Sequence, residues 1–351
     1  RQRTTDIVAA RKVSRYRQFA KVCHEAFPPE SFTPAEAHLE KAANAAAGDP
    51  EAAARVAFLR KGLKHAKLCV RVAGLLAGTE EAASPMAARR AVNELIAFRR
   101  EVERDNIANL HYVSSVEERS WQIPEGYGGE PLRAVSETVA KLEGAPSFPV
   151  RGGSACVALL KPGERFRAGL TCRPIGKDPG GANWSLFGPD DALLAKGSVE
   201  PGKAGEIDVA ARKEGVHILS VAAGRHLARI TLHNDHAAVT ARRLALTYDA
   251  SPLFFYVPAG VKEFTLTLDS PAPGETARVG VVDPQGREVA SGSTGAREQV
   301  ALKLKVPAGQ DGRAWSVVVA KAETGALEDY ALRLDDALPP FWSHAPDRLV
   351  V

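Results

Sequence analysis

The chain has 351 residues and a formal net charge of +4, with 45% hydrophobic and 25% charged residues. This length allows two or three domains with sizeable cores, and the composition is ordinary for a globular protein. The mild charge argues against a nucleic-acid partner, and the lack of a long apolar run predicts no membrane span. The sequence starts at Arg1 without a charged-then-apolar leader, so we expect any signal peptide, and any chain next to it, to be missing.

Residues 1–110 predict an α-helical bundle. Thr33-Pro34, Asp49-Pro50 and Ser84-Pro85 each combine a capping residue with a proline suited to the first helical turn. The clearest helix covers 50–77, where apolar residues recur every three or four positions as one stripe. The stripe consists of Val56, Leu59, Leu63, Ala66, Val70 and Ala73. We expect helices at 7–26 and 86–104 to cover it.

Basic residues follow another face of the same helix. They are Arg60, Lys64, Lys67 and Arg71. The pattern favours a solvated face beside the apolar stripe, and the alternative is contact with an anionic partner.

Residues 111–149 predict a linker between helical and β parts. The stretch 121–129 is rich in Gly and Pro and reads as irregular. We expect a short helix at about 132–142.

From about residue 150 the apolar pattern changes to short runs with a period near two, separated by Gly, Pro and Asp. The predicted strands are 155–160, 166–172, 184–187, 217–222, 228–232, 253–257, 264–268, 277–282, 315–319 and 330–334. This is typical of all-β sandwiches, either jelly-roll or immunoglobulin-like.

The β-rich stretch also repeats itself. Residues 187–198 parallel 282–293 at an offset of 95 residues, with a strand, a proline-initiated turn and a second strand in each. Two further pairs of segments keep nearly the same offset. We therefore expect a multidomain α plus all-β chain, with two tandem antiparallel sandwiches at 150–248 and 249–337 and a tail at 338–351.

Two cysteines flank a predicted turn at 161–164. In a hairpin centred near residue 164, Cys156 and Cys172 lie opposite each other, and an oxidising compartment would allow a disulfide. The favoured interpretation is two small buried apolar residues.

The sequence contains no recognisable catalytic or cofactor motif. His233, Asp235 and His236 are the only weak metal candidates, and the Asn-Asp between the histidines favours a turn. The acidic pairs at 190–191 and 335–336 also fit solvated turns. We predict no metal and no other cofactor.

Four aromatic residues are candidates for stacking on sugar rings, because an exposed aromatic face suits the apolar face of a pyranose. They are Trp184, Tyr127, Trp121 and Trp342. The alternative for each is core or inter-domain packing, and Trp184 is the best exposed candidate.

The segments FPPESFTP at 27–34 and RVAFLRKGLKHAKL at 55–68 resemble the helical tail of a large bacterial family of unknown function. The central domain of that family is related to the family-67 α-glucuronidases, which are glycoside hydrolase barrels. The endings LPPFW at 338–342 and DRLVV at 347–351 are also similar. The resemblance implies that the barrel lies upstream of Arg1, so it assigns no catalytic residue here.

The first functional hypothesis is a non-catalytic accessory region of an exported, glycoside-hydrolase-like protein. Its helices would support the upstream catalytic domain, and its sandwiches would bind or position polysaccharide. The alternative is a structural, assembly or cell-surface spacer protein that contacts other subunits. A third interpretation places an active site within this chain. We expect secretion, a periplasmic location or the cell surface.

Overall fold

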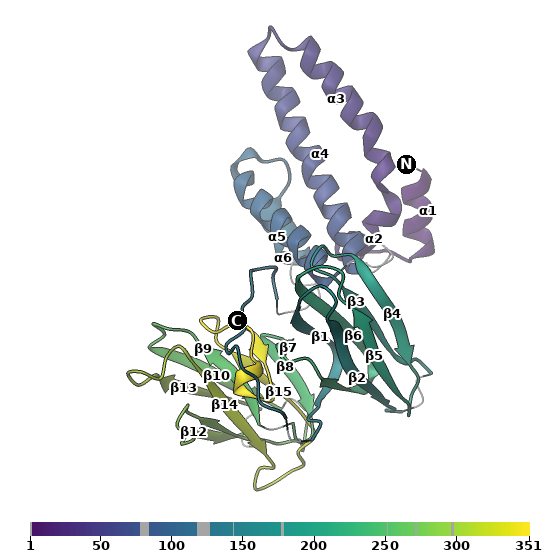
Figure 1. Ribbon diagram of the computed structural model, residues 1–351. Helices are drawn as coiled ribbons and strands as arrows, with labels where there is room; N and C mark the ends of the chain where they lie inside the picture. Colours follow the sequence, from purple (N-terminus) through teal and green to yellow (C-terminus); the bar gives the residue numbers. More distant parts are fainter. Residues whose placement is uncertain are drawn as a thin grey trace. The chain divides into compact units, whose positions relative to one another are not determined.

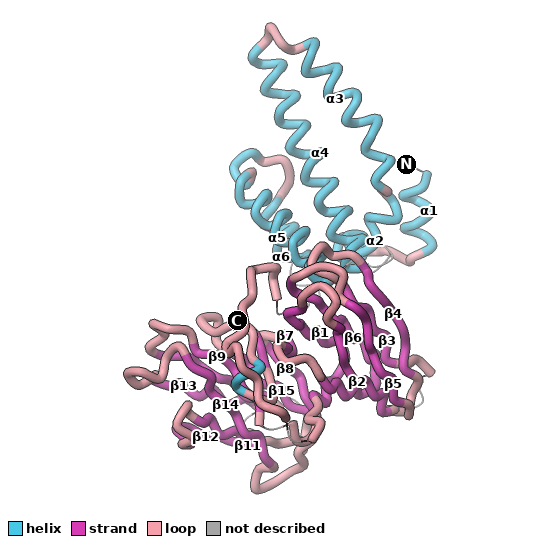
Figure 2. The backbone as a smooth tube through the Cα atoms, in the orientation of Figure 1, coloured by secondary structure: helices cyan, strands magenta, loops and turns pink. Residues whose placement is uncertain are grey.

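The computed structural model describes residues 2–77, 84–117, 127–142, 144–176, 179–250, 252–270, 272–295 and 298–351. The chain divides into two compact units, 1–123 and 124–351. The first is helical and the second is built from antiparallel strands, as Figures 1 and 2 show. The predicted fold class is therefore confirmed. In the described part of the chain, no helix is both long and apolar enough to cross a membrane.

The first unit consists of helices and short helical turns. These are α1 (Gln2–Ala10), α2 (Tyr16–Ala26), the 3-10 helix η1 (Pro29–Phe32), α3 (Thr33–Ala45), α4 (Pro50–Ala77), α5 (Pro85–Glu101), η2 (Glu103–Asp105) and α6 (Leu110–Glu117).

Two of the three predicted helix caps are confirmed. Asp49 Oδ1 accepts hydrogen bonds from the backbone N–H groups of Glu51 (2.9 Å) and Ala52 (3.1 Å) at the start of α4. Ser84 Oγ accepts one from Ala87 (3.0 Å) at the start of α5. Thr33 instead is the first residue of α3, after an uncapped Phe32.

The single helix expected at 7–26 is wrong, because the chain breaks between α1 and α2. Lys12 has a φ of 50°, which ends α1 in a left-handed conformation. Gln18 Oε1 then accepts a hydrogen bond from the backbone N–H of Arg15 (3.1 Å), which caps a new helix.

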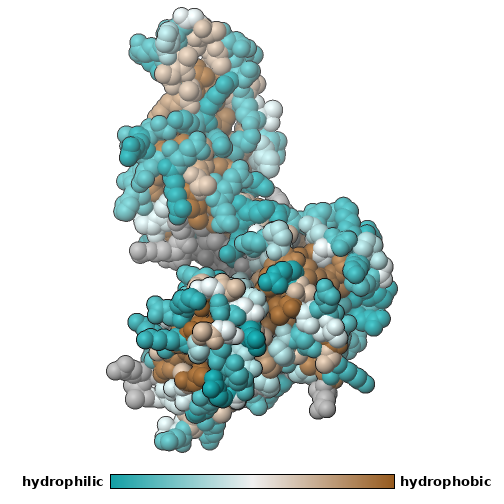
Figure 3. Space-filling model, turned by 60° about the vertical axis from the view of Figure 1, so that its left-hand side comes forward, coloured by the Kyte–Doolittle hydropathy of each residue, from teal (hydrophilic) through white to brown (hydrophobic). Residues whose placement is uncertain are grey.

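The apolar stripe of α4 is covered only toward its C-terminal end. Val70 and Ala73 are each 7% exposed and pack with Cys23 and Phe32. Leu59 is 55% exposed, and its neighbours Arg60 and Lys61 pair with Glu40 of α3 and Asp105 of η2. Figure 3 shows apolar residues, in brown, reaching the surface of the α3–α4 hairpin among polar ones.

The second unit contains every predicted strand, and several more. The strands are β1 (Phe148–Leu160), β2 (Arg165–Arg173), β3 (Ala182–Phe187), β4 (Leu193–Val199), β5 (Ala204–Ala210), β6 (Gly215–Leu232), β7 (Ala237–Thr240), β8 (Arg243–Thr247), β9 (Leu253–Val257), β10 (Glu263–Asp269), β11 (Arg278–Val282), β12 (Glu288–Ser293), β13 (Gln299–Lys305), β14 (Arg313–Ala320), β15 (Asp329–Leu334) and β16 (Phe341–Trp342). A last 3-10 turn, η4, covers Pro346–Arg348.

The two halves of this unit, β1 to β8 and β9 to β15, pair their strands by one plan. In the first half β6 pairs β1 and β3, β3 pairs β4, and β2 pairs β5 and the end of β6. In the second half β14 pairs β9 and β11, β11 pairs β12, and β10 pairs β13 and β15. A bulge follows Leu186 in β3 and Val281 in β11, 95 positions apart. The pairing plans match, and a common origin of the halves stays a prediction.

The expected boundary between 248 and 249 does not separate two sandwiches. Strand β8 pairs with β15, which puts strands of both halves into one 12-stranded sheet within the described residues. In the same sheet β16 pairs with β7, and Phe254 of β9, in the four-stranded sheet, exchanges two backbone hydrogen bonds with Ser343 (2.7 and 3.0 Å). Strand pairing therefore connects the two halves at several places around one hydrophobic core.

The expected linker and tail also belong to this unit. Residues 132–142 form no helix, because the backbone of Arg133 and Val135 bonds with Val351 and Leu349 instead. Tertiary pairing has overridden a helix-compatible local sequence here. The helix in the expected linker is α6.

Candidate functional site

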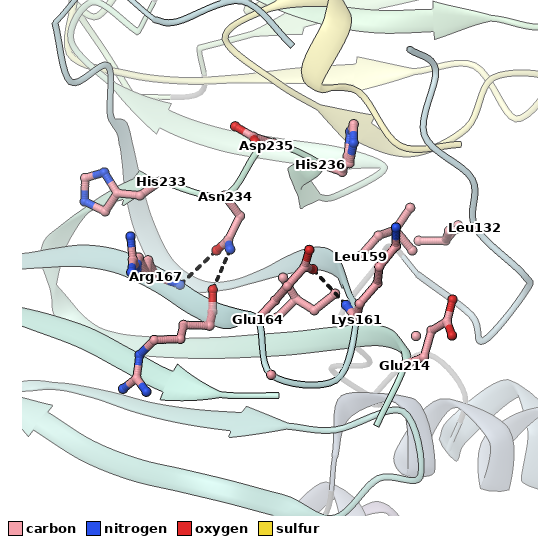
Figure 4. Close-up of a pocket in the computed structure, with 14 residues that line it drawn as sticks. Leu132, Leu159, Lys161, Glu164, Arg167, Glu214, His233, Asn234, Asp235 and His236 are labelled. Atoms are coloured by element: carbon pink, nitrogen blue, oxygen red, sulfur yellow. Dashed lines mark hydrogen bonds between the residues drawn. The ribbon is translucent and has the colours of Figure 1, made fainter. Parts of the chain in front are cut away.

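A groove of about 750 Å³ surrounds the turn between β1 and β2 in the second unit. Its walls come from this turn, the start of β2, the β5–β6 loop, the β6–β7 loop and the segment around Leu132 (Figure 4). The floor includes Leu159 and Leu160 at the end of β1.

The groove carries both signs of charge in equal number. Its ionisable side chains, apart from two histidines, are Lys161, Arg165, Arg167, Glu164, Glu214 and Asp235. Three cations and three carboxylates give a formal charge of zero. The groove thus offers many hydrogen-bond donors and acceptors. Because its formal charge is zero, it favours neither an anionic nor a cationic ligand.

The β1–β2 turn is fixed by its own hydrogen bonds. Gly163 has a φ of 86°, a conformation that glycine adopts without strain. The Glu164 carboxylate accepts the backbone N–H of Lys161 (2.8 Å), and the Glu164 N–H donates back to the Lys161 carbonyl (3.1 Å). In the described residues, no hydrogen bond or ion pair engages the Lys161 ammonium or the Glu214 carboxylate.

Asn234 locks the β6–β7 loop onto the edge of β2. Its Oδ1 accepts the backbone N–H of Arg167 (2.8 Å), and its Nδ2 donates to the carbonyl of Arg165 (2.7 Å), as the dashed lines in Figure 4 show. Arg167 also accepts a hydrogen bond from the His233 N–H (3.1 Å). Both the oxygen and the nitrogen of the Asn234 amide therefore bond to β2 and hold the loop in place.

Arg348, from the C-terminal segment, holds the loop from its other side. Its Nη1 donates to the Asn234 carbonyl (2.9 Å), and its Nη2 lies 3.4 Å from an Asp235 carboxylate oxygen and 3.3 Å from the Ala140 carbonyl. Its side chain is 11% exposed. The loop that presents His233 and His236 is thus anchored by two independent groups.

Two arginines of β2 share one carboxylate outside the groove. Asp208 of β5 pairs with Arg165, and lies 3.9 Å from Arg167 Nε. His233 lies 3.9 Å from Glu206. These pairs are exposed, so each side chain can exchange its partner for a ligand at small cost.

The structure does not gather the weak metal candidates into a site. Figure 4 shows His233, Asp235 and His236 pointing in different directions from the loop. Among the described residues, no group of three or more His, Cys, Asp and Glu side chains could hold a metal. The interpretation of this segment as a turn agrees with the loop between β6 and β7.

The aromatic candidates are not brought together. Trp342 is 0% exposed and donates its indole N–H to the Ala241 carbonyl (3.0 Å), so the stacking prediction for it is wrong. Tyr127 is half-buried with its ring 6.4 Å from that of Phe341. Trp121 lies outside the described residues.

Trp184 is half-buried on β3 and covers Gly197 of β4. A Cβ atom at Gly197 would lie 2.7 Å from Cζ2 of the indole, so only glycine allows this contact. The ring also packs against the hydrophobic core. Sugar stacking on its remaining face stays a prediction.

Cys156 and Cys172 are free buried thiols. The expected hairpin is absent, because β6 lies between β1 and β2 and pairs with both. Burial raises the pKa of Cys156 to about 12. The favoured interpretation of both as small buried apolar residues agrees with this placement.

Of the six charged groove residues, only Asp235 was a site candidate from the sequence, as a weak metal ligand. The sequence placed Lys161 and Glu164 in a turn, and it assigned no structural or functional role to Glu214. The available signal was the period-two spacing of Arg165 and Arg167, which places both on the solvent face of β2.

No known protein family and no curated protein matches this sequence. Among solved structures, a β-glucuronidase from Ruminococcus gnavus in complex with uronic isofagomine is similar at 8% identity and a TM-score of 0.18, over 52% of this chain and 35% of that one. An 11S allergen from Cocos nucifera matches at 10% identity and a TM-score of 0.18, over 56% and 90%. A deletion mutant of oxalate decarboxylase from Bacillus subtilis matches at 9% identity and a TM-score of 0.18, over 65% of this chain and 84% of that one.

This chain spans about a third of the length of that first glucuronidase structure. Likenesses with such TM-scores are too distant to carry an argument about function. The resemblance of the sequence to proteins related to family-67 α-glucuronidases gains no support from them.

Proposed function

We propose that the second unit binds a neutral polysaccharide in the groove around the β1–β2 turn. The observation that carries this proposal is the balanced set of donors and acceptors, three cations and three carboxylates, along one groove of about 750 Å³.

The chemistry of a sugar hydroxyl fits this balance. Each hydroxyl both donates and accepts hydrogen bonds, so a polyol is best matched by neighbouring groups of both kinds. A phosphate or a carboxylate would instead favour a surplus of Arg and Lys. Leu159 and Leu160 add a small apolar surface for the C–H face of a sugar ring.

The rigidity of the loops supports binding as well. Asn234 and Arg348 hold the β6–β7 loop, and the Glu164 carboxylate holds the β1–β2 turn. Side chains on a preformed surface lose less conformational entropy when a ligand binds.

The proposal places this unit in a non-catalytic accessory region of an exported protein that acts on carbohydrate. The resemblance at 55–68 supports an upstream catalytic domain as the partner. Fractionation of cells that express the complete gene tests the location. Finding the protein only in the cytosol would contradict export.

Affinity electrophoresis of the full chain in gels that contain xylan, mannan or a β-glucan tests the binding. Polygalacturonate serves as the acidic comparison. We expect retardation by at least one neutral polymer, and at least a tenfold weaker affinity for Arg167→Ala/Glu214→Ala, or about 1.4 kcal/mol. Both side chains are exposed, so the variant should fold.

Lys305→Ala is the matched control, because Lys305 is exposed on β13 outside the groove. It should bind like the unchanged protein. Retention on no neutral polymer, or equal retention of the groove variant and the control, would contradict the proposal.

A second candidate function is protein assembly through the α3–α4 hairpin. The observation that favours it is the exposed apolar pair Phe58 (45%) and Leu59 (55%) on α4. Contiguous exposed apolar surface can mark a protein contact, and these two side chains are neighbours on the same helix. Sedimentation velocity over a concentration series should show association that Phe58→Ser/Leu59→Ser removes. A monomer at all concentrations would exclude self-assembly through Phe58 and Leu59.

A further inference from the structure

The helical unit contains a second groove, of about 640 Å³, whose lining differs in kind from the first. Helix α4 forms its floor, and its walls come from α2 with η1 on one side and α5 on the other. The floor residues Lys64, Lys67, Leu68, Arg71 and Gly74 recur at spacings of three and four, which places them on one helix face. This is the basic face noted in the sequence.

The inner part of the groove is apolar. Phe32, Leu68 and Val70 line it and are 8%, 6% and 7% exposed. They belong to the two small cores on either side of α4, so the groove runs over packed side chains. Its volume falls within the range of about 300–1,000 Å³ typical of small-molecule sites.

The rim is cationic. Three cations, Lys64, Lys67 and Arg71, line the groove against one carboxylate, that of Glu94. Lys67 pairs with Glu36 and Arg71 with Glu94 (2.9 Å), with side chains 46–53% exposed. Pairs at this exposure contribute little to stability, so an incoming anion can replace one partner.

The Lys64 ammonium has a different neighbour. It lies 4.4 Å from the centre of the Phe98 ring. A cation over an aromatic face keeps its hydrogen-bonding protons available to an anion on its other side.

His24 adds an unsatisfied polar group to the wall. Both ring nitrogens are shielded from water and have no hydrogen-bond partner among the described residues. Burial lowers the pKa of this imidazole, so the neutral ring keeps one N–H donor and one acceptor. Buried polar atoms are normally paired, so this unpaired ring is an unusual feature of the groove wall.

We propose that this groove binds a monocarboxylate with an unbranched hydrocarbon chain, such as a medium-chain fatty acid. The carboxylate lies at the Lys64, Lys67 and Arg71 rim, and the chain lies along Phe32, Leu68 and Val70. The site belongs to the first unit and does not depend on glycan binding by the second.

Isothermal titration of the full chain with decanoate, below its micelle concentration, tests the proposal. Decanol and decyltrimethylammonium are the matched neutral and cationic probes. We expect saturable binding of decanoate, at least tenfold weaker binding of decanol, and none of the cation.

Charge reversal on the rim separates this site from general surface binding. Lys67→Glu/Arg71→Glu should weaken decanoate at least tenfold. Arg55→Glu is the control, since Arg55 lies on α4 outside the groove and pairs only with exposed Glu51.

Three results would overturn the proposal. One is equal affinity for decanoate and decanol, and another is an equal loss in the rim variant and the Arg55 control. The third is saturable binding of an acidic amphipathic peptide without any binding of decanoate, which would identify a helix-docking groove instead. Circular dichroism of each variant confirms that it folds.

Discussion

Arg99 and Glu117 form an ion pair inside the helical unit, with side chains 3% and 5% exposed. Arg99 lies on α5 and donates to the carboxylate of Glu117 on α6. The Tyr16 hydroxyl donates to the other carboxylate oxygen (2.5 Å), and Arg99 Nε donates to His65 Nε2 (3.2 Å). One buried network thus joins α2, α4, α5 and α6.

Breaking this pair from one side should destabilise the helical unit strongly. Arg99→Met leaves the Glu117 carboxylate buried without its cation, at a cost of about 3–5 kcal/mol in the free energy of unfolding. Arg99→Met/Glu117→Leu should recover most of that loss. Urea denaturation followed by far-UV circular dichroism measures both, with Arg55→Ala as an exposed control below about 1 kcal/mol. A double variant as unstable as the single one would refute this account.

The thiols near this network make the unit sensitive to alkaline pH. Burial, reinforced by the charge of Glu117, raises the pKa of Cys69 from 9.0 to about 11. The unfolded chain therefore loses this proton first. The stabilising contribution of the neutral thiol is complete below pH 9 and is lost as the pH rises toward 11. Thermal melts across this window should show a falling midpoint, with a shallower fall for Cys69→Ala. Parallel curves for the two proteins would contradict the prediction.

Cys156 and Cys172 should stay unlinked even under oxidising conditions. Cys156 lies opposite Leu219 of β6, whereas Cys172 lies opposite Ala228, nine residues further along the same strand, so the two cysteines are not neighbours in the sheet, and both are free thiols. Non-reducing peptide mapping by mass spectrometry should find no peptide that joins the two. Thiol reagents should modify both only after denaturant is added. A linked peptide from folded protein would disprove this placement.

Trp342 should be one of the most sensitive positions of the second unit. It is fully buried, its ring lies 5.8 Å from Phe255 of β9, and its N–H bonds to the Ala241 carbonyl beside β7. Trp342→Ala should therefore lower the free energy of unfolding by about 3–5 kcal/mol, and Trp342→Phe by less. Calorimetry measures this, with exposed Val318→Ala on β14 as the control. A loss no larger than the control's would refute the role of this indole.

The sequence predicted the elements better than their assembly. Helix α4 and the ten predicted strand segments carry strong periodic patterns, and each lies in the expected element, although 217–222 and 228–232 are parts of one strand, β6. Strands β7, β8 and β16 were not predicted, yet their pairing joins the halves. Such pairing connects residues far apart in the sequence, 84 positions for Leu246 and Tyr330, and local patterns do not contain it.

The groove around the β1–β2 turn was hidden for a related reason. Lys161 and Glu164 are ordinary turn residues by sequence, and only the fold brings Asn234 and Arg348 beside them. Trp342 shows the opposite case. Its aromatic type matched a sugar platform, but a pairing partner far along the chain buries it.

Strand pairing between the two halves limits how this chain can be shortened or recombined. A polypeptide that ended at 248 would leave β7 and β8 without their neighbours β16 and β15, and the remainder would lack theirs. Unpaired strand edges invite other chains to add to them, so either fragment would tend to aggregate. In related sequences, insertions and deletions should therefore occur in the surface loops, and the two halves should always occur together in one chain.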